Sequence, residues 1–130
     1  MNRIFNYEFQ VRGYELDSFG HVNNAVYLNY LEQARWEIVE KLGVLELLKN
    51  NDSIFIVVET SIRYVNELNI FDVVFVETEM FRNGFFVEFK HKIKTSKTKI
   101  AKAYVKCLFV DKTNRFPVDI PEELLLCINE

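Results

Sequence analysis

A single segment of helical periodicity, set among strand-like runs, constrains the fold of this 130-residue chain more than any other feature. Apolar side chains recur three or four positions apart from Asn24 to Leu42, which predicts one long helix with a single apolar stripe. The stripe consists of Tyr27, Leu31, Ala34, Ile38 and Leu42. Asn23 or Asn24 can cap the first turn of this helix, and Gly43 can end it in the left-handed conformation.

Strand patterns rich in Val, Ile and Phe dominate the rest of the chain. Five runs are expected to be strands: Phe5–Tyr14, Ile54–Tyr64, Ile70–Phe81, Val87–Lys94 and Lys99–Val110. The first of them is broken near Gly13. The pair Asn83-Gly84 favours a tight hairpin turn, and Ser96–Lys97 favours another before the last strand. A short helical segment is expected at Leu45–Lys49.

Short connections between these runs imply antiparallel pairing, because parallel strands need longer crossovers. The single long helix must then cover the apolar face of the sheet. The predicted fold class is therefore α+β, with one antiparallel sheet of about five strands wrapped around one long helix. A chain of 130 residues suits one domain, which we expect to span residues 1–130.

Composition is typical of a globular protein, since 49% of the residues are hydrophobic and 27% are charged. No run approaches the roughly 18 apolar residues of a membrane-spanning helix, and the N-terminus lacks the apolar stretch of a signal peptide. We therefore expect a cytoplasmic protein. Cys107 and Cys127 are expected to be buried free thiols. His21 and His91 lack metal-ligand spacing, so no metal site is expected, and His91 alternates with apolar residues as a packed core histidine would.

Charge is distributed unevenly along the chain. The net charge of −3 argues against a nucleic-acid-binding protein, yet residues 89–110 contain seven lysines and no acidic residue. Lys90, Lys92 and Lys94 share one face of a strand, because side chains alternate with period two. This basic stretch indicates one anionic partner, with a solvated strand face as the alternative.

The segment from Val11 to Glu37 contains the residues that could take part in a reaction. It places a carboxylate, Asp17, in a loop just before the start of the long helix. Backbone N–H groups at a helix start are unpaired and carry partial positive charge, so they can polarise an ester or thioester carbonyl. Asp17 could then attack that carbonyl or activate a water molecule beside it. The alternative is that Asp17 is only a turn or capping residue.

The string VRGYELDSFGHVNNAVYLNYLEQARWE resembles the opening of the 4-hydroxybenzoyl-CoA thioesterase-like family of hotdog-fold acyl-CoA thioesterases. The family pattern R-x-x-x-x-D-x-x-G-H-V-N-N-x-x-Y is matched in register by Arg12, Asp17, Gly20, His21, Val22, Asn23, Asn24 and Tyr27. Weaker single matches follow along the rest of the chain, at Glu32, Ala34, Arg35, Arg63, Tyr64 and Asp72.

The resemblance implies a hotdog fold and hydrolysis of the thioester of a fatty or aromatic acyl-CoA to the free acid and CoA. This reaction is expected to need no cofactor or metal. Asp17 falls on the family's catalytic carboxylate, as general base or nucleophile, and Asn24 falls near the backbone N–H that binds the thioester carbonyl. His21 matches a catalytic histidine of some plant acyl-carrier-protein thioesterases, although Phe19 replaces the Asn that those enzymes have two residues after the Asp. Asn23 is either a helix cap or an amide that positions water.

The resemblance also places Gly20 and Tyr27 beside Asn24 among the substrate-binding residues. The three lysines at positions 90, 92 and 94 are candidates for contacts with the phosphates of CoA. Members of the family work as homodimers or homotetramers. Trp36 fits such an assembly, because it lies on the helix away from the apolar stripe, where an isolated exposed Trp favours a subunit contact.

Three alternatives stay open at this point. The chain could be an acyl-carrier-protein thioesterase, or an acyl-CoA hydratase or dehydratase on the same fold. It could also be a non-catalytic protein that binds acyl-CoA, because a fold alone does not establish a function.

Overall fold

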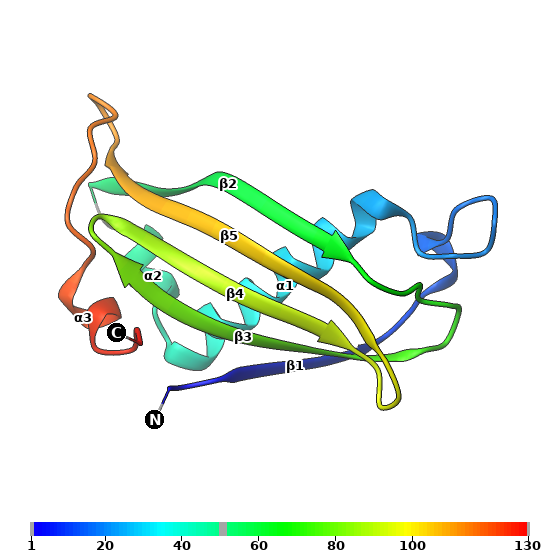
Figure 1. The fold of residues 1–130 in the computed structure, drawn as a ribbon. Helices are drawn as coiled ribbons and strands as arrows, with labels where there is room; N and C mark the ends of the chain where they lie inside the picture. Colours follow the sequence, from blue (N-terminus) through cyan, green and yellow to red (C-terminus); the bar gives the residue numbers. More distant parts are fainter. Residues whose placement is uncertain (1, 50–51, 130) are drawn as a thin grey trace.

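A computed structural model describes residues 2–49 and 52–129. Its elements are β1 (Phe5–Gln10), the 3₁₀ turn η1 (Gly13–Glu15), α1 (Asn24–Leu42), α2 (Leu45–Lys49), β2 (Ser53–Tyr64), β3 (Val73–Asn83), β4 (Phe86–Lys94), β5 (Lys99–Asp111) and α3 (Glu122–Leu125). The strands form one sheet in the order β1-β3-β4-β5-β2, and every neighbouring pair is antiparallel. Helix α1 lies along one face of this curved sheet (Figure 1). The predicted α+β architecture of five strands around one long helix is confirmed.

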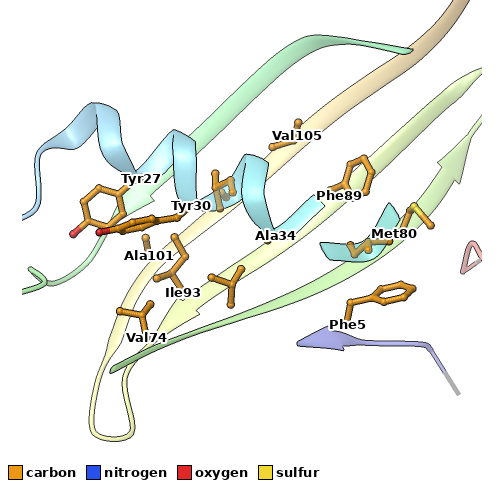
Figure 2. Close-up of a cluster of buried hydrophobic side chains, with 14 of the residues drawn as sticks. Phe5, Tyr27, Tyr30, Ala34, Val74, Met80, Phe89, Ile93, Ala101 and Val105 are labelled. Atoms are coloured by element: carbon orange, nitrogen blue, oxygen red, sulfur yellow. The ribbon is translucent and has the colours of Figure 1, made fainter. Parts of the chain in front are cut away.

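The core lies between α1 and the sheet, because each strand alternates apolar and polar side chains. On β4, Phe89 and Ile93 are buried toward the helix while Lys90 and Lys92 are exposed on the opposite face. Figure 2 shows Tyr30 and other side chains of α1 facing the buried side chains of the sheet. We call the side of the sheet that faces away from α1 the outer face.

Helix α1 has the predicted bounds and the predicted ends. The side chain of Asn23 accepts a hydrogen bond from the N–H of Ala25 at 3.0 Å. Gly43 ends the helix with φ of 67°, a conformation that glycine adopts without steric cost. The predicted stripe is buried except for half-buried Leu42, and Tyr30 joins it. The short helix α2 is confirmed as well.

Two predicted strand boundaries are wrong. The first strand ends at Gln10 and not at Tyr14, because the chain turns into η1 and ties Glu15 back to Arg12. The third strand begins at Val73 and not at Ile70. Before it, Phe71 adopts a positive φ of 67°, and the carboxylate of Asp72 accepts the N–H of Asn69 at 2.8 Å. Local turn hydrogen bonds therefore replace strand pairing in both places.

Strand β2 ends the sheet on one side and pairs only with β5. A register shift between Val57 and Glu59 leaves Val58 without a partner on β5, so the strand bulges there. Val57 and Val58 are 51% and 45% exposed, and Trp36 of α1 is 51% exposed. In the described residues no helix is long and apolar enough to cross a membrane. Of the two free thiols, Cys107 is buried as predicted and Cys127 only half-buried.

Candidate active site

The loop before α1 is held in a closed turn that presents Asp17. The N–H of Asp17 donates to the carbonyl of His21 at 2.7 Å, and the N–H of Gly20 donates to the carbonyl of Asp17 at 3.2 Å. Oδ1 of Asp17 accepts the N–H groups of Phe19 at 2.8 Å and of His21 at 3.2 Å. The carboxylate therefore orders its own turn through one oxygen, while Oδ2 accepts no hydrogen bond from the described residues.

A buried glutamate, Glu15, also holds this loop in place. Glu15 is 3% exposed, and its carboxylate accepts the N–H of Arg12 at 2.8 Å and two guanidinium donors of Arg12 at 3.0 and 2.7 Å. The hydroxyl of Tyr30 on α1 donates to the same carboxylate at 2.9 Å. Burial, and then the hydrogen bond to Glu15, raise the pKa of Tyr30, so this phenol stays protonated. Sequence reasoning missed Glu15, although its spacing of three residues from Arg12 was a visible signal.

The histidine of the loop is also held in place. Nε2 of His21 lies 2.9 Å from a carboxylate oxygen of Glu67, which lies in the segment between β2 and β3. The backbone of His21 forms a bridge with Asn69, and the N–H of Val22 donates to the carbonyl of Leu68 at 3.1 Å. The turn that carries Asp17 is thereby fixed against the chain that follows β2.

These segments enclose a pocket of about 460 Å³ at the N-terminal end of α1. Its lining consists of Asp17, Phe19, His21, Val22, Asn24, Tyr27, Tyr64, Asn66 and Glu67. The hydroxyl of Tyr64 donates to the carbonyl of Asn24 at 3.2 Å, and the rings of Tyr27 and Tyr64 meet edge to face at 5.0 Å. Tyr64 is the last residue of β2, and Asn66 and Glu67 lie in the segment that follows it. These three residues were not predicted as one wall of a site with Asp17.

Four of the predicted site residues are brought together in this pocket: Asp17, His21, Asn24 and Tyr27. Two others do not line it. Asn23 caps α1 through its side-chain oxygen, which favours the cap over the water-positioning amide. Gly20 has φ of 83°, so it shapes the turn in a conformation that other residues rarely adopt. The N–H of Asn24, in the first turn, has no acceptor among the described residues.

The three predicted phosphate-binding lysines lie apart from this pocket, on the outer face of the sheet. Lys90 and Lys92 line a hollow of about 410 Å³ there together with Lys102. Lys94 forms an ion pair with Glu77 at 3.2 Å. Nζ of Lys90 lies 4.7 Å from the ring centroid of Phe81. These contacts give the outer face a mixed charge pattern.

Comparison with known proteins places this architecture in a family. The model of the thioesterase-like superfamily matches residues 11–126. Over 123 residues the chain is 31% identical to the acyl-CoA thioesterase YbgC of Haemophilus influenzae, which covers 91% of this chain and 90% of that protein. It is also 42% identical over 57 residues to the long-chain acyl-CoA thioesterase FadM of Escherichia coli, a match to 44% of this chain and 43% of FadM. The chain thus matches less than half the length of FadM.

Solved structures share the fold over nearly the whole chain. A 1,4-dihydroxy-2-naphthoyl-CoA thioesterase from Synechocystis superposes with a TM-score of 0.89 at 17% identity, covering 97% of this chain and 96% of that one. The probable thioesterase YbaW of Escherichia coli gives a TM-score of 0.84 at 26% identity, covering 95% of each chain. The sheet wrapped around α1, the full-length superpositions and the family match agree, and we conclude that this chain belongs to the thioesterase-like superfamily and has the hotdog fold.

Proposed function

We propose that the protein is an acyl-CoA thioesterase that hydrolyses a fatty or aromatic acyl-CoA to the free acid and CoA. The observation that carries this proposal is that Asp17 and the first turn of α1 line the same pocket. Support also comes from two relatives named as acyl-CoA thioesterases, YbgC and FadM. A neighbour in fold, SAV2348 of Staphylococcus aureus, is described in complex with CoA.

In this proposal the helix start polarises the thioester. The backbone N–H of Asn24 donates to the thioester oxygen, and the partial positive charge of the helix N-terminus stabilises the oxyanion that forms. Oδ2 of Asp17 then accepts a proton from water as the water attacks the carbonyl carbon. In the alternative route Oδ2 attacks that carbon itself, and after CoA leaves, water hydrolyses the resulting acyl-enzyme anhydride and regenerates the carboxylate. The C–S bond breaks, and the thiolate of CoA takes up a proton.

His21 is proposed to act in the same pocket. Because Glu67 holds its Nε2 at 2.9 Å, the imidazole has a fixed orientation beside the loop. It can therefore orient the loop or contact the substrate directly. Tyr27 and Tyr64 form the aromatic wall against which the acyl group would pack.

The phosphates of CoA are proposed to meet the cations of the outer face, with Lys90, Lys92 and Lys94 as the candidates. Arg63 lines the outer hollow, and the next residue, Tyr64, lines the Asp17 pocket. Because successive side chains of a strand point to opposite faces, the two sites lie at the same end of β2 but on opposite sides of the sheet. Exposed lysines act as screened point charges, so their contribution should appear in KM and weaken with salt.

An acyl-carrier-protein thioesterase is the second candidate. It is favoured by a 50% identity over 44 residues to the chloroplast acyl-acyl carrier protein thioesterase ATL3 of Arabidopsis thaliana, a match to 34% of this chain and 23% of ATL3. To decide between the two carriers, the same acyl group is offered on CoA and on acyl carrier protein, and the two kcat/KM values are compared.

The test of the proposed activity is a panel of acyl-CoA thioesters, with release of the CoA thiol as the measurement. Asp17→Asn keeps the shape of the side chain but removes the base, so kcat should fall about 10²- to 10⁴-fold. Asp119→Asn, at an exposed position far along the chain, is the matched control and should keep wild-type turnover. Wild-type turnover in a folded Asp17→Asn protein would contradict the assignment, and tight acyl-CoA binding without turnover in the wild type would indicate a binding protein.

A further inference from the structure

A half-buried guanidinium, that of Arg35, lies between α1 and the sheet, and no ion pair of the described residues includes it. Nη1 of Arg35 lies 3.4 Å from Nε2 of His91, and its guanidinium carbon lies 5.8 Å from the ring centroid of Phe89. Burial lowers the pKa of Arg35, although Cys107 and Glu32 oppose this effect. Glu32 lies three residues earlier on the helix, but no ion pair of the described residues includes Arg35. A cation in this position is costly unless an anion joins it.

The contact with His91 does not supply that anion. A guanidinium has only donors, so Nε2 of His91 must accept from Arg35, and Nδ1 must carry the ring proton. Nδ1 then donates to the hydroxyl of Thr78 at 2.8 Å. Burial, followed by the charge of Arg35, lowers the pKa of His91 to about 3, so the imidazole is neutral. The hydrogen-bond chain therefore orients the guanidinium but adds no negative charge beside it.

The guanidinium opens onto a cavity that is separate from the Asp17 pocket. This cavity has a volume of about 400 Å³ and lies among α1, α2 and β2, and the two pockets have no lining residue in common. Its apolar walls include Trp36, Leu42, Leu48 and Phe55. A volume of this size is within the range of small-molecule sites, which combine apolar walls with a few fixed polar groups.

We propose that this cavity binds a free fatty acid, with the carboxylate on Arg35 and the alkyl chain along the apolar walls between α1, α2 and β2. A guanidinium matches a carboxylate in charge and can donate two parallel hydrogen bonds to it. Of the other charged residues that line the cavity, Lys49 would add to this attraction and Glu32 would oppose it. The site goes beyond the proposed hydrolysis, because its ligand is the acid itself, not a thioester. Since the proposed reaction releases such an acid, the cavity would bind the class of product that the enzyme forms.

Trp36 makes occupancy of the cavity directly measurable, because it is the only Trp of the chain and lines this cavity. Brominated dodecanoic acid should quench the fluorescence of Trp36, and unlabelled dodecanoate should reverse the quenching. Dodecanol has the same chain without the charge and should compete at least ten-fold more weakly. Equal competition by the acid and the alcohol would overturn the proposal, because it would leave Arg35 without a role.

Substitution of Arg35 tests the anchor. Arg35→Met removes the charge but keeps an apolar side chain of similar length, so the affinity for dodecanoate should fall at least ten-fold while that for dodecanol stays unchanged. Arg82→Met, in the exposed β3–β4 hairpin, is the matched control and should bind both ligands like the wild type. Circular dichroism and thermal unfolding of each variant establish that it is folded. Undiminished dodecanoate affinity in folded Arg35→Met contradicts the proposal.

The same assay separates this site from the proposed active site. Asp17→Asn should lose hydrolysis and still show full quenching of Trp36 by the brominated acid. If the acid bound in the Asp17 pocket instead, unlabelled acyl-CoA would compete for it and Arg35→Met would have no effect, which would overturn the proposal. A second copy of the chain that filled the cavity would abolish quenching by the brominated acid, and this result would also overturn the proposal.

Discussion

Two buried polar residues, Glu15 and His91, show what the sequence can and cannot predict about single side chains. His91 alternates with apolar neighbours on a strand, so its burial was predicted and is confirmed at 1% exposure. Glu15 is buried because Arg12 and Tyr30 surround its carboxylate. Tyr30 is fifteen residues away, so this burial depends on how α1 packs and not on any local pattern.

Glu15→Gln should destabilise the protein through this cluster. The amide removes the charge that accepts both guanidinium donors of Arg12, and charge-assisted hydrogen bonds contribute about 1.5–3 kcal/mol. Because Arg12 is partly solvated, we expect a loss near the lower end, about 2 kcal/mol in the free energy of unfolding measured by urea titration. Glu8→Gln, exposed on β1, is the control and should change this free energy by less than about 0.5 kcal/mol. Equal stability of both variants would show that the cluster contributes nothing.

His91 should make folding sensitive to pH. Its pKa is about 3 in the folded chain and about 6.5 when unfolded, so between these values the unfolded chain binds the extra proton. The stabilisation is therefore complete above pH 6.5 and is lost as the pH falls toward 3, by up to about 1.4 kcal/mol per pH unit from this group. His91→Gln cannot titrate, so its free energy of unfolding should depend less steeply on pH between 6 and 4. If the free energy of unfolding had the same pH dependence in the wild type and in His91→Gln, His91 would not be the cause of that dependence.

At the scale of elements, the ends of α1 were predictable and the ends of two strands were not. Asn23 and Gly43 signal the helix ends through local chemistry, and both act as predicted. The early end of β1 and the late start of β3 depend on turn hydrogen bonds at Arg12 and Asp72, which compete with strand pairing. Strand propensity alone gives no information on which of these two interactions prevails.

Asn23→Ala should weaken the start of α1. It removes the side-chain acceptor of the Ala25 N–H, and the loss of such a cap costs about 1 kcal/mol. Asn29→Ala, at an exposed position within the helix, should instead be neutral or slightly stabilising, because Ala has the higher helix propensity. Thermal unfolding of both variants measures the difference. Equal midpoints would mean that the cap does not stabilise the fold.

At the scale of the whole molecule, the long helix and four later strands were enough to predict the architecture, but the pocket was only half predictable. Asp17, His21, Asn24 and Tyr27 come from one continuous motif. The opposite wall, from Tyr64 to Glu67, reaches the site only because β2 runs along the edge of the sheet and ends beside α1. Such proximity follows from topology and has no signal in the sequence.

The exposed apolar residues of β2 and α1 favour self-association, and we expect a homodimer or homotetramer. Sedimentation velocity at micromolar concentration should show no stable monomer for the wild type. Val57→Lys adds a charge at the exposed edge, so it should shift the protein toward the monomer. Leu126→Lys changes an equally apolar and 88% exposed residue elsewhere and should leave the assembly intact. A wild-type monomer would contradict this expectation.

The open edge of β2 also affects how the chain reaches its folded state. An edge strand with unpaired backbone groups and exposed valines is a template for any extended segment, including the same strand of a chain that is still unfolded. Refolding from urea is therefore a competition between correct folding and aggregation, and the yield should fall as protein concentration rises. The bulge at Val58 limits this risk, because it breaks the regular spacing that a growing cross-β stack requires.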